Sequence, residues 1–357
     1  MNLSVNGHNA LIVVFITFLV SVVLVPLAKK CAIHTGAMDM PNARKIQKEP
    51  VPRMGGLGVF GAFLVGYMLF ARSSYQMISI LIGGFIIVFI GMIDDIKSVG
   101  ALPKFIMHII AACVIVFYGK IVIDYVDLFG FSINFPVPLN YIITIFFIVA
   151  ITNAINLIDG LDGLSSGISS IYFLTIAIIG FILNRAEGLD TMLSLITLGA
   201  TLGFLVYNFY PAKIYIGDSG SYFLGYIISI IALLGYKGPT LTTLIIPVVI
   251  LAIPIFDTGL AILRRALKGQ GIGTPDKEHF HFQLLKMRFS IPASVLIIYG
   301  INILFSSVSI FYVLGDKKLA IGVYVALMVL LLFLVVKTDI LFEHKKDKKN
   351  EKRGKKA

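Results

Sequence analysis

Charged side chains are scarce in this chain of 357 residues: Asp, Glu, Lys and Arg make up 14% of it, whereas soluble domains average about 25%. Hydrophobic residues reach 58%, and the mean hydropathy is +0.94. Apolar runs of about 17 to 20 residues recur along the chain, and each is long enough to cross a bilayer as a helix. The low charge excludes an ordinary soluble protein and predicts an all-α polytopic membrane protein.

Cysteine is also rare. The chain contains two, Cys31 and Cys113, and they lie far apart. This spacing excludes a disulfide framework and a CxxC metal site. A cleaved signal peptide is not expected, because the first apolar run, Ala10 to Ala28, has spanning length and lacks a basic leader and a small-residue cleavage site.

Eleven membrane spans are predicted in a single domain over residues 1–336, followed by a basic cytoplasmic tail over 337–357 that is expected to be disordered. An external N-terminus places 24 of the 30 Lys and Arg residues on the cytoplasmic side, and the positive-inside rule therefore predicts N-terminus outside and C-terminus inside. The approximate spans are 9–28, 55–71, 75–93, 103–119, 138–156, 168–184, 191–209, 219–236, 241–263, 292–314 and 319–336.

Two further features concern the surface of the chain. Residues 121–138 alternate weakly in polarity around Gly130 and predict a short external β-hairpin. The net charge of +11 is concentrated in the tail, which favours contact with anionic lipid and argues against nucleic-acid binding.

Adjacent carboxylates end one of the apolar spans. In the segment GMIDDIKSVGALPKF, Asp94 and Asp95 close a span and Lys104 opens the next. A single Asp at a helix end can simply reach the headgroups, but two adjacent carboxylates repel each other and favour a bound cation or a raised pKa. Carboxylates beside spans are usually functional because each costs about 2.5–3.5 kcal/mol at depth.

The segment TNAINLIDGLDGLSSG places polar residues where another apolar helix ends. Asn153, Asn156 and Asp159 follow one another at intervals of three residues and share one helix face if the helix continues. The glycines that follow allow a turn and a close backbone approach to a ligand. A polar helix cap without further function is the alternative.

The segment NFYPAKIYIGDSGS combines a cation with a carboxylate at a helix start. Pro211 ends the preceding helix, Lys213 supplies a positive charge, and Asp218 lies in a glycine-bounded turn. Backbone N–H groups at a helix N-terminus bind phosphate, and an adjacent Asp suits Mg²⁺. A capped turn is the alternative.

A fourth polar segment follows the ninth span. Asp257 lies toward the end of this span, and the residues after it are mostly basic or imidazole side chains: Arg264, Arg265, Lys268, Asp276, His279 and His281. The His-x-His pair lacks a third strong zinc ligand, so phosphate contact fits better than zinc. Together the four segments predict phosphoryl transfer to or from a lipid, with a divalent cation neutralising the developing charge.

These segments resemble those of the polyprenyl-phosphate N-acetylhexosamine-1-phosphate transferases, as does PNARKIQKEPVPRMGG before the second span. The resemblance implies that a UDP-amino sugar and polyprenyl (undecaprenyl) phosphate give a polyprenyl-diphosphate sugar and UMP. It also implies Mg²⁺, with Mn²⁺ as a substitute, and a multi-pass protein of the bacterial plasma membrane with its active site on the cytoplasmic face. The oligomeric state stays open, a homodimer included.

The resemblance also implies roles for individual residues. Asp218 would be the principal metal ligand and Asn156 a second one. Asp94 and Asp95 would be the carboxylates nearest the lipid phosphate, as a base or as charge positioners. Phosphate oxygens would be contacted by Lys104, His279 and His281, and the nucleotide pocket would be lined by Asn153, Asp159, Asp162, Asn208 and Tyr215, with Lys48 approaching it.

Within the family, the PRMGG and HFH segments resemble the branch that uses UDP-N-acetylglucosamine, although Phe282 replaces the last histidine of that branch's HxHH pattern. The expected reaction is transfer of N-acetylglucosamine 1-phosphate to undecaprenyl phosphate, the first membrane step of a teichoic acid or O-antigen type of glycan. Another UDP-N-acetylhexosamine or UDP-muramoyl-pentapeptide is the alternative substrate. An ion-coupled secondary transporter is the alternative of another class, although its charges would lie near the membrane midplane.

Overall fold

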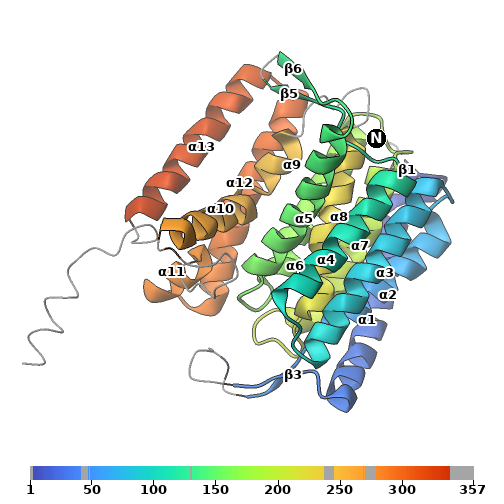
Figure 1. The fold of residues 1–357 in the computed structure, drawn as a ribbon, viewed down its shortest axis with the longest axis vertical. Coiled ribbons are helices and arrows are strands. Elements are labelled where there is room, and N and C mark those ends of the chain that lie inside the picture. The colour runs from blue at the N-terminus through green and yellow to red at the C-terminus, as the bar shows by residue number, and fades with distance from the viewer. Residues whose placement is uncertain are drawn as a thin grey trace, which may run out of the picture.

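The computed structural model describes residues 3–41, 47, 49–128, 131–236, 245–267, 269 and 279–337. These residues form a bundle of long helices that run roughly along one axis (Figure 1). Eight helical segments in the described ranges are long and apolar enough to cross a membrane: α1 (Ala10–Thr35), α3 (Tyr75–Ile96), α4 (Ala101–Cys113) with its π-helical continuation (Val114–Tyr118), α5 (Leu139–Ile158), α6 (Leu164–Ile182), α7 (Leu189–Asn208), α8 (Gly217–Tyr236) and α12 (Ile291–Leu314).

The predicted all-α polytopic membrane protein is confirmed, and each predicted span overlaps one helix or, in one case, two. Helix α2 (Gly55–Phe70) has only 16 residues. The predicted span 241–263 is divided into α9 (Ile245–Ile250) and α10 (Ala252–Leu267), and its first four residues lie outside the described ranges. A short helix, α11 (Phe280–Lys286), precedes α12, and α13 (Lys317–Lys337) ends the described chain.

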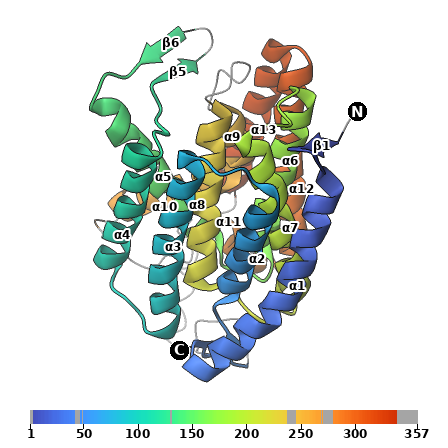
Figure 2. The same ribbon diagram turned by 90° about the vertical axis from the view of Figure 1, so that its right-hand side faces the viewer.

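Short antiparallel hairpins connect some of these helices. The predicted hairpin is present as β5 (Tyr125–Leu128) and β6 (Phe131–Asn134), although Gly130 itself lies outside the described residues. This hairpin lies at the same end of the bundle as β1 (Ser4–Val5) and β2 (His8–Asn9) (Figures 1 and 2). The pair β3 (Met38–Asp39) and β4 (Val51–Pro52) lies at the opposite end (Figure 1). The tail 338–357 is outside the described residues.

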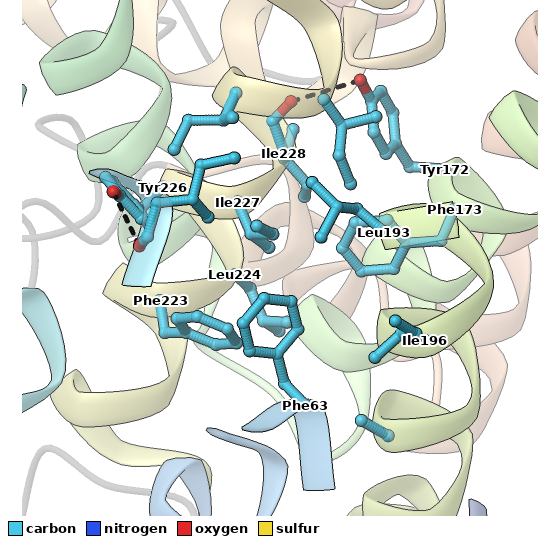
Figure 3. Packing of buried hydrophobic residues seen from close by; sticks show 14 of the residues in the cluster. Phe63, Tyr172, Phe173, Leu193, Ile196, Phe223, Leu224, Tyr226, Ile227 and Ile228 are labelled. Atoms are coloured by element: carbon cyan, nitrogen blue, oxygen red, sulfur yellow. Dashed lines mark hydrogen bonds between the residues drawn. The ribbon is translucent and has the colours of Figure 1, made fainter. Parts of the chain in front are cut away.

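Helix α8 forms the centre of the bundle (Figure 2). Its aromatic side chains are buried, and Phe223 packs edge-on against Phe63 with ring centroids 5.2 Å apart. Buried hydroxyl groups are satisfied by helix carbonyls: Tyr226 donates to the Ile80 oxygen at 3.1 Å and Tyr172 to the Ile228 oxygen at 3.2 Å (Figure 3). The central helix is therefore held by apolar packing and by the hydrogen bonds that the Tyr226 and Tyr172 hydroxyls form.

Small residues let the backbones of neighbouring helices touch. A Cβ at Gly56 in α2 would overlap the backbone of Gly220 in α8, and a Cβ at Gly91 in α3 would overlap Ser219. In a membrane, where lipid is as apolar as the helices, such close packing is a main source of helix association. These contacts place the first turn of α8 directly against α2 and α3.

A proline explains why α9 and α10 are separate helices. Pro254 has no N–H group, so the Ile250 carbonyl, four residues earlier, loses its helical partner. Asn302 of α12 replaces that partner, because its side-chain nitrogen donates to the Ile250 oxygen at 2.8 Å. Asn302 is fully buried, and the break is thus stabilised from a neighbouring helix.

A double-mutant cycle tests this replacement. Pro254→Ala restores an N–H group that can bond to Ile250, so Asn302→Ala should cost less stability in that background than in the wild type. The coupling should be about 1 kcal/mol, the size of an interhelical hydrogen bond in membranes. Thermal unfolding of the four proteins in detergent measures it, and additive costs would contradict the assignment.

Candidate active site

Three carboxylates and a lysine meet where α3 ends and where α4 and α8 begin. Lys104 Nζ lies 3.3 Å from Asp94 Oδ2 and 3.1 Å from Asp218 Oδ2. Asp95 lies next to Asp94 at the end of α3, and it contacts the first turn of α8. Four residues that are separated by up to 124 positions in sequence are thereby brought together at one end of the bundle.

The adjacent carboxylates Asp94 and Asp95 have different surroundings. Asp95 is buried, and its two oxygens accept hydrogen bonds from the N–H groups of Asp218 (2.8 Å) and Ser219 (3.1 Å) and from the Ser219 hydroxyl (2.7 Å). Asp94 accepts one bond from the Val99 N–H at 2.7 Å and keeps its other oxygen on Lys104. Because a helix N-terminus carries unpaired N–H groups, Asp95 satisfies the start of α8 and orients the helix that carries Asp218.

Arg53 is a site residue that sequence analysis did not identify. Its Nη2 lies 3.4 Å from Asp95 Oδ1 and 3.5 Å from Asp218 Oδ1, and its Nη1 lies 3.9 Å from Asp39 Oδ1. Burial alone would lower the pKa of Arg53, but the surrounding carboxylates outweigh it and raise the pKa, so the guanidinium stays charged. The PRMGG segment was the available signal, although nothing in it places the arginine beside residues more than 40 positions away.

The asparagines of α5 face α4 and α8. Asn156 donates from Nδ2 to Asp218 Oδ1 at 3.3 Å and to Ser221 Oγ at 2.8 Å. Asn153, one turn earlier, donates to the Val149 carbonyl and lies 3.3 Å from His108 Nδ1. Asn156 therefore joins the acidic cluster, whereas Asn153 lies beside a buried histidine that sequence analysis also missed.

The turn between α5 and α6 is built from side-chain bonds to the backbone. Helix α6 begins at Leu164, four residues before the predicted span, because Gly163 takes a positive φ of 78° and Asp159 Oδ1 accepts the Ser165 hydroxyl at 2.5 Å. Asp162 accepts the Ala212 N–H at 2.9 Å. The predicted nucleotide contacts Asp159 and Asp162 thus share one turn next to the loop before α8.

Asn208 supports the same turn from behind. Its Oδ1 accepts the Gly163 N–H and the Ser166 hydroxyl, and its Nδ2 donates to the Ile214 carbonyl. These three bonds use most of the hydrogen-bonding capacity of a side-chain amide. The structure therefore gives Asn208 a supporting position, and a direct nucleotide contact stays a prediction.

Burial raises the pKa of Asp159 to about 7, whereas the Ser165 hydrogen bond opposes this shift. The folded protein then holds a proton on Asp159 that the unfolded chain, with a pKa near 3.8, has lost. Its stability should fall as the pH rises from about 4 to about 7 and stay level above that range. Asp159→Asn should abolish this pH-dependent contribution. The thermal midpoints of variant and wild type, measured against pH, should therefore diverge between about pH 4 and pH 7. Midpoints that change in parallel with pH would contradict the raised pKa of Asp159.

The remaining residues of the predicted nucleotide pocket lie around the loop before α8. The Tyr215 hydroxyl donates to Gln47 Oε1 at 3.1 Å, and burial raises the pKa of Tyr215. Lys213 is exposed, and its backbone N–H donates to the Tyr207 carbonyl. Lys48 lies outside the described residues, as do Lys268 and Asp276.

The two predicted histidines lie on the other side of the turn. His279 and His281 are buried, and their rings stack in parallel with centroids 5.7 Å apart. A Cβ at Gly160 would overlap the His281 ring, so the histidine segment contacts the turn that carries Asp159. Burial lowers the pKa of His281 to about 4, and its ring is neutral at pH 7. Asp257, which the sequence placed at a span end, lies instead inside α10, 2.7 Å from His279 Nδ1.

The donor set suits a hard cation that shares its coordination with a ligand. Within the described residues no group of three or more His, Cys, Asp or Glu side chains is arranged to hold a metal. Asp218 offers a partly exposed carboxylate, and the Asn156 amide contacts it. Mg²⁺ commonly binds proteins through one or two carboxylates and takes its other ligands from phosphates and water, so the residues present fit this ion better than zinc.

Comparison with known proteins supports these observations. Residues 77–236 match the model of glycosyl transferase family 4. The chain is 41% identical over 336 residues to the probable undecaprenyl-phosphate N-acetylglucosaminyl 1-phosphate transferase of Bacillus subtilis, covering 92% of both chains. It is 34% identical to the decaprenyl-phosphate N-acetylglucosaminephosphotransferase of Mycolicibacterium smegmatis, over 84% of this chain and 81% of the relative.

A more distant relative agrees with these two. The undecaprenyl-phosphate alpha-N-acetylglucosaminyl 1-phosphate transferase of Salmonella typhi is 29% identical over 76% of each chain. The predicted family resemblance is confirmed, since the similarity to the Bacillus subtilis protein extends over nearly the whole chain. The chain belongs to the polyprenyl-phosphate N-acetylglucosamine-1-phosphate transferases of glycosyl transferase family 4.

Proposed function

We propose that this protein transfers N-acetylglucosamine 1-phosphate from UDP-N-acetylglucosamine to undecaprenyl phosphate and releases UMP. The observation that carries the proposal is the cluster of Asp94, Asp95 and Asp218 with Lys104 and Arg53 at one end of the bundle. Carboxylates and cations at a membrane edge suit a reaction between two phosphates, one of which is attached to a lipid. The names of the relatives supply the sugar and the lipid.

The reaction requires alignment more than base catalysis. A phosphate monoester is mostly dianionic at pH 7 because its second pKa is about 6. An oxygen of the lipid phosphate attacks the β-phosphorus of the UDP-sugar, and a new P–O bond forms. The bond from that phosphorus to the oxygen bridging the α-phosphate breaks, and UMP leaves with this oxygen. No proton has to be removed from the nucleophile, so positioning and charge neutralisation carry the rate.

The positions of the residues indicate which of them neutralise charge, which hold the site in shape and which bind the nucleotide. Lys104 and Arg53 neutralise phosphate oxygens next to Asp218, and Asp94 holds Lys104 in place. Asp95 keeps the first turn of α8, and therefore Asp218, in register with α3. The turn with Asp159 and Asp162 receives the nucleotide, and the histidine segment beside it contacts phosphate oxygens.

The family consists of phosphotransferases that are generally metal-dependent. Mg²⁺ would be held by Asp218 and Asn156 together with phosphate oxygens, with Mn²⁺ as a substitute. When bound, it neutralises charge that develops on the diphosphate as the P–O bond breaks.

The proposed orientation places the site on the cytoplasmic face of the bacterial plasma membrane. The cluster lies at the end of the bundle opposite the β5–β6 hairpin and the N-terminus (Figures 1 and 2). The sequence count assigns 24 of the 30 Lys and Arg residues to the segments predicted to be cytoplasmic and to the tail, and such a bias marks the cytoplasmic side. UDP-sugars then reach the site from the cytoplasm, and the product would start a cell-envelope glycan of the teichoic acid or O-antigen type.

A reconstitution experiment tests the function. Purified protein in lipid nanodiscs with undecaprenyl phosphate and Mg²⁺ should release UMP from UDP-N-acetylglucosamine and form a lipid product with the mass of the diphosphate-linked sugar. A panel of UDP-sugars, including UDP-muramoyl-pentapeptide, identifies the donor. Exclusive use of another donor would overturn the sugar assignment, and solute uptake in proteoliposomes without UMP release would favour a transporter.

A further inference from the structure

Asp257 holds the histidine segment by two separate bonds. Its Oδ2 lies 2.7 Å from His279 Nδ1, and its Oδ1 accepts the backbone N–H of Phe280 at 2.9 Å. Asp257 and His279 are each 4% exposed. The carboxylate on α10 thus determines both the start of α11 and the orientation of the imidazole.

The pairing selects one form of the His279 ring. A carboxylate has no proton to give and accepts hydrogen bonds only, so the proton of this bond belongs to His279 Nδ1. In the neutral ring the other nitrogen, Nε2, is then free of hydrogen and can accept a bond; in the charged ring it donates one. The form with hydrogen only on Nε2 would place two acceptors against each other at 2.7 Å.

The pair lies next to the candidate active site. The His281 ring stacks on His279 with an interplanar angle of 5° and contacts Gly160 in the turn after α5. Both ring nitrogens of His281 are buried and have no hydrogen-bond partner among the described residues. Leu284 of α11 packs in one apolar cluster with Ile158 and Leu161 of the same turn. The His279 ring is therefore separated from the turn that carries Asp159 only by the His281 ring.

We propose that Asp257 is a positioning residue of the transferase, which fixes one hydrogen on His279 Nδ1 so that a second proton taken up by the ring lies on Nε2 and is donated to a phosphate oxygen of the sugar nucleotide. This role rests on the proposed function and adds to it a residue on α10. A cap for α11 alone would need only the bond to the Phe280 N–H, whereas the bond to Nδ1 acts on the ring itself.

Asp257→Asn separates these two tasks. The new amide oxygen can still accept the Phe280 N–H, so α11 keeps its start. The amide nitrogen then faces Nδ1 and donates to it, which forces the hydrogen of the neutral ring onto Nε2. The variant keeps the shape of the site, reverses the tautomer of the neutral ring and prevents the ring from carrying hydrogen on both nitrogens.

Nitrogen-15 NMR of histidine-labelled protein in lipid, recorded without substrates, measures this reversal. The chain has six histidines, and the His279 signals are assigned by their absence in His279→Ala. Wild type should show hydrogen on Nδ1, and Asp257→Asn should show it on Nε2. Asp190→Asn, which alters a buried carboxylate paired with Arg185 at 3.3 Å, is the matched control and should leave the signals unchanged. Hydrogen on Nδ1 in Asp257→Asn would overturn the proposal.

Kinetics test whether Asp257 acts through His279. Asp257→Asn should lower kcat for UMP release, because the neutral ring that it leaves donates to the phosphate oxygen without a positive charge. The loss should be about 10- to 100-fold, by analogy with residues that orient metal-bound histidines, with little change in KM. In a His279→Ala background the same substitution should cause no further loss. A full additional loss there would overturn the proposal. Wild-type protein without UMP release would refute the function itself, whereas the NMR result stands independently of activity.

Discussion

Asp218→Ala is expected to reduce UMP release by about 10²–10³-fold or more while the protein stays folded. The Asp218 carboxylate faces Lys104 at 3.1 Å, Arg53 at 3.5 Å and the Asn156 amide at 3.3 Å. It is therefore the group on which contacts from two helices and a loop converge, and losing one well-placed electrostatic group typically costs that much rate. UMP release at saturating substrates measures the effect.

The backbone of Asp218 explains why the fold should survive. The bonds that hold the first turn of α8 run from the Asp218 and Ser219 N–H groups to Asp95, and none uses the Asp218 side chain. Thermal unfolding in detergent should therefore stay close to wild type. Glu187→Gln is the control, because Glu187 lies in an exposed ion pair with Arg72 at 3.4 Å and should leave activity intact. Near-normal transfer by Asp218→Ala would contradict the metal assignment.

Asp95→Ala should lose both activity and stability, unlike its neighbour Asp94. Removing the Asp95 carboxylate leaves two N–H groups at the start of α8 without a partner and Arg53 without one of its counter-charges. Breaking such a buried arrangement from one side costs about 3–5 kcal/mol. The thermal midpoint of Asp95→Ala should fall clearly, and transfer should fall with it because Asp218 loses its orientation.

Asp94→Asn provides the comparison. An asparagine at position 94 can still accept the Val99 N–H, so the helix end keeps its hydrogen bond. It loses the charge that faces Lys104 at 3.3 Å, and activity should drop with a small change in thermal midpoint. If Asp95→Ala unfolded at the wild-type temperature while losing transfer, Asp95 would act on the substrate directly and the supporting role would be wrong.

Several parts of the site could be predicted because polar residues are rare in this chain. Polar side chains at the ends of apolar runs are energetically costly and therefore usually functional. Five such residues are visible in the sequence: Asp94, Asp95, Lys104, Asn156 and Asp218. The structure brings all five into one cluster. Their roles in the reaction remain predictions that the variants above test.

Arg53 and Asp257 could not be assigned in this way. Arg53 belongs to a short loop, and its partners Asp95 and Asp218 follow more than 40 and more than 160 positions later. Asp257 lies inside α10, where the local sequence does not indicate its partner, and only the return of the chain through α11 brings His279 to it. The role of each residue depends on a contact between two elements that are distant in sequence. Local sequence patterns do not predict how such elements are placed relative to each other.

The sequence by itself determined that this protein is a helical membrane protein and where its long helices lie, and it predicted which polar segments meet at one site, because hydrophobic length and the cost of buried charge are local properties. The tertiary structure decided how those residues divide their tasks. Asp94 and Asp95 are neighbours of the same type, yet one is tied to the start of α8 and the other to Lys104. That difference arises from the close packing of α8 against α2 and α3, where glycines let the backbones touch.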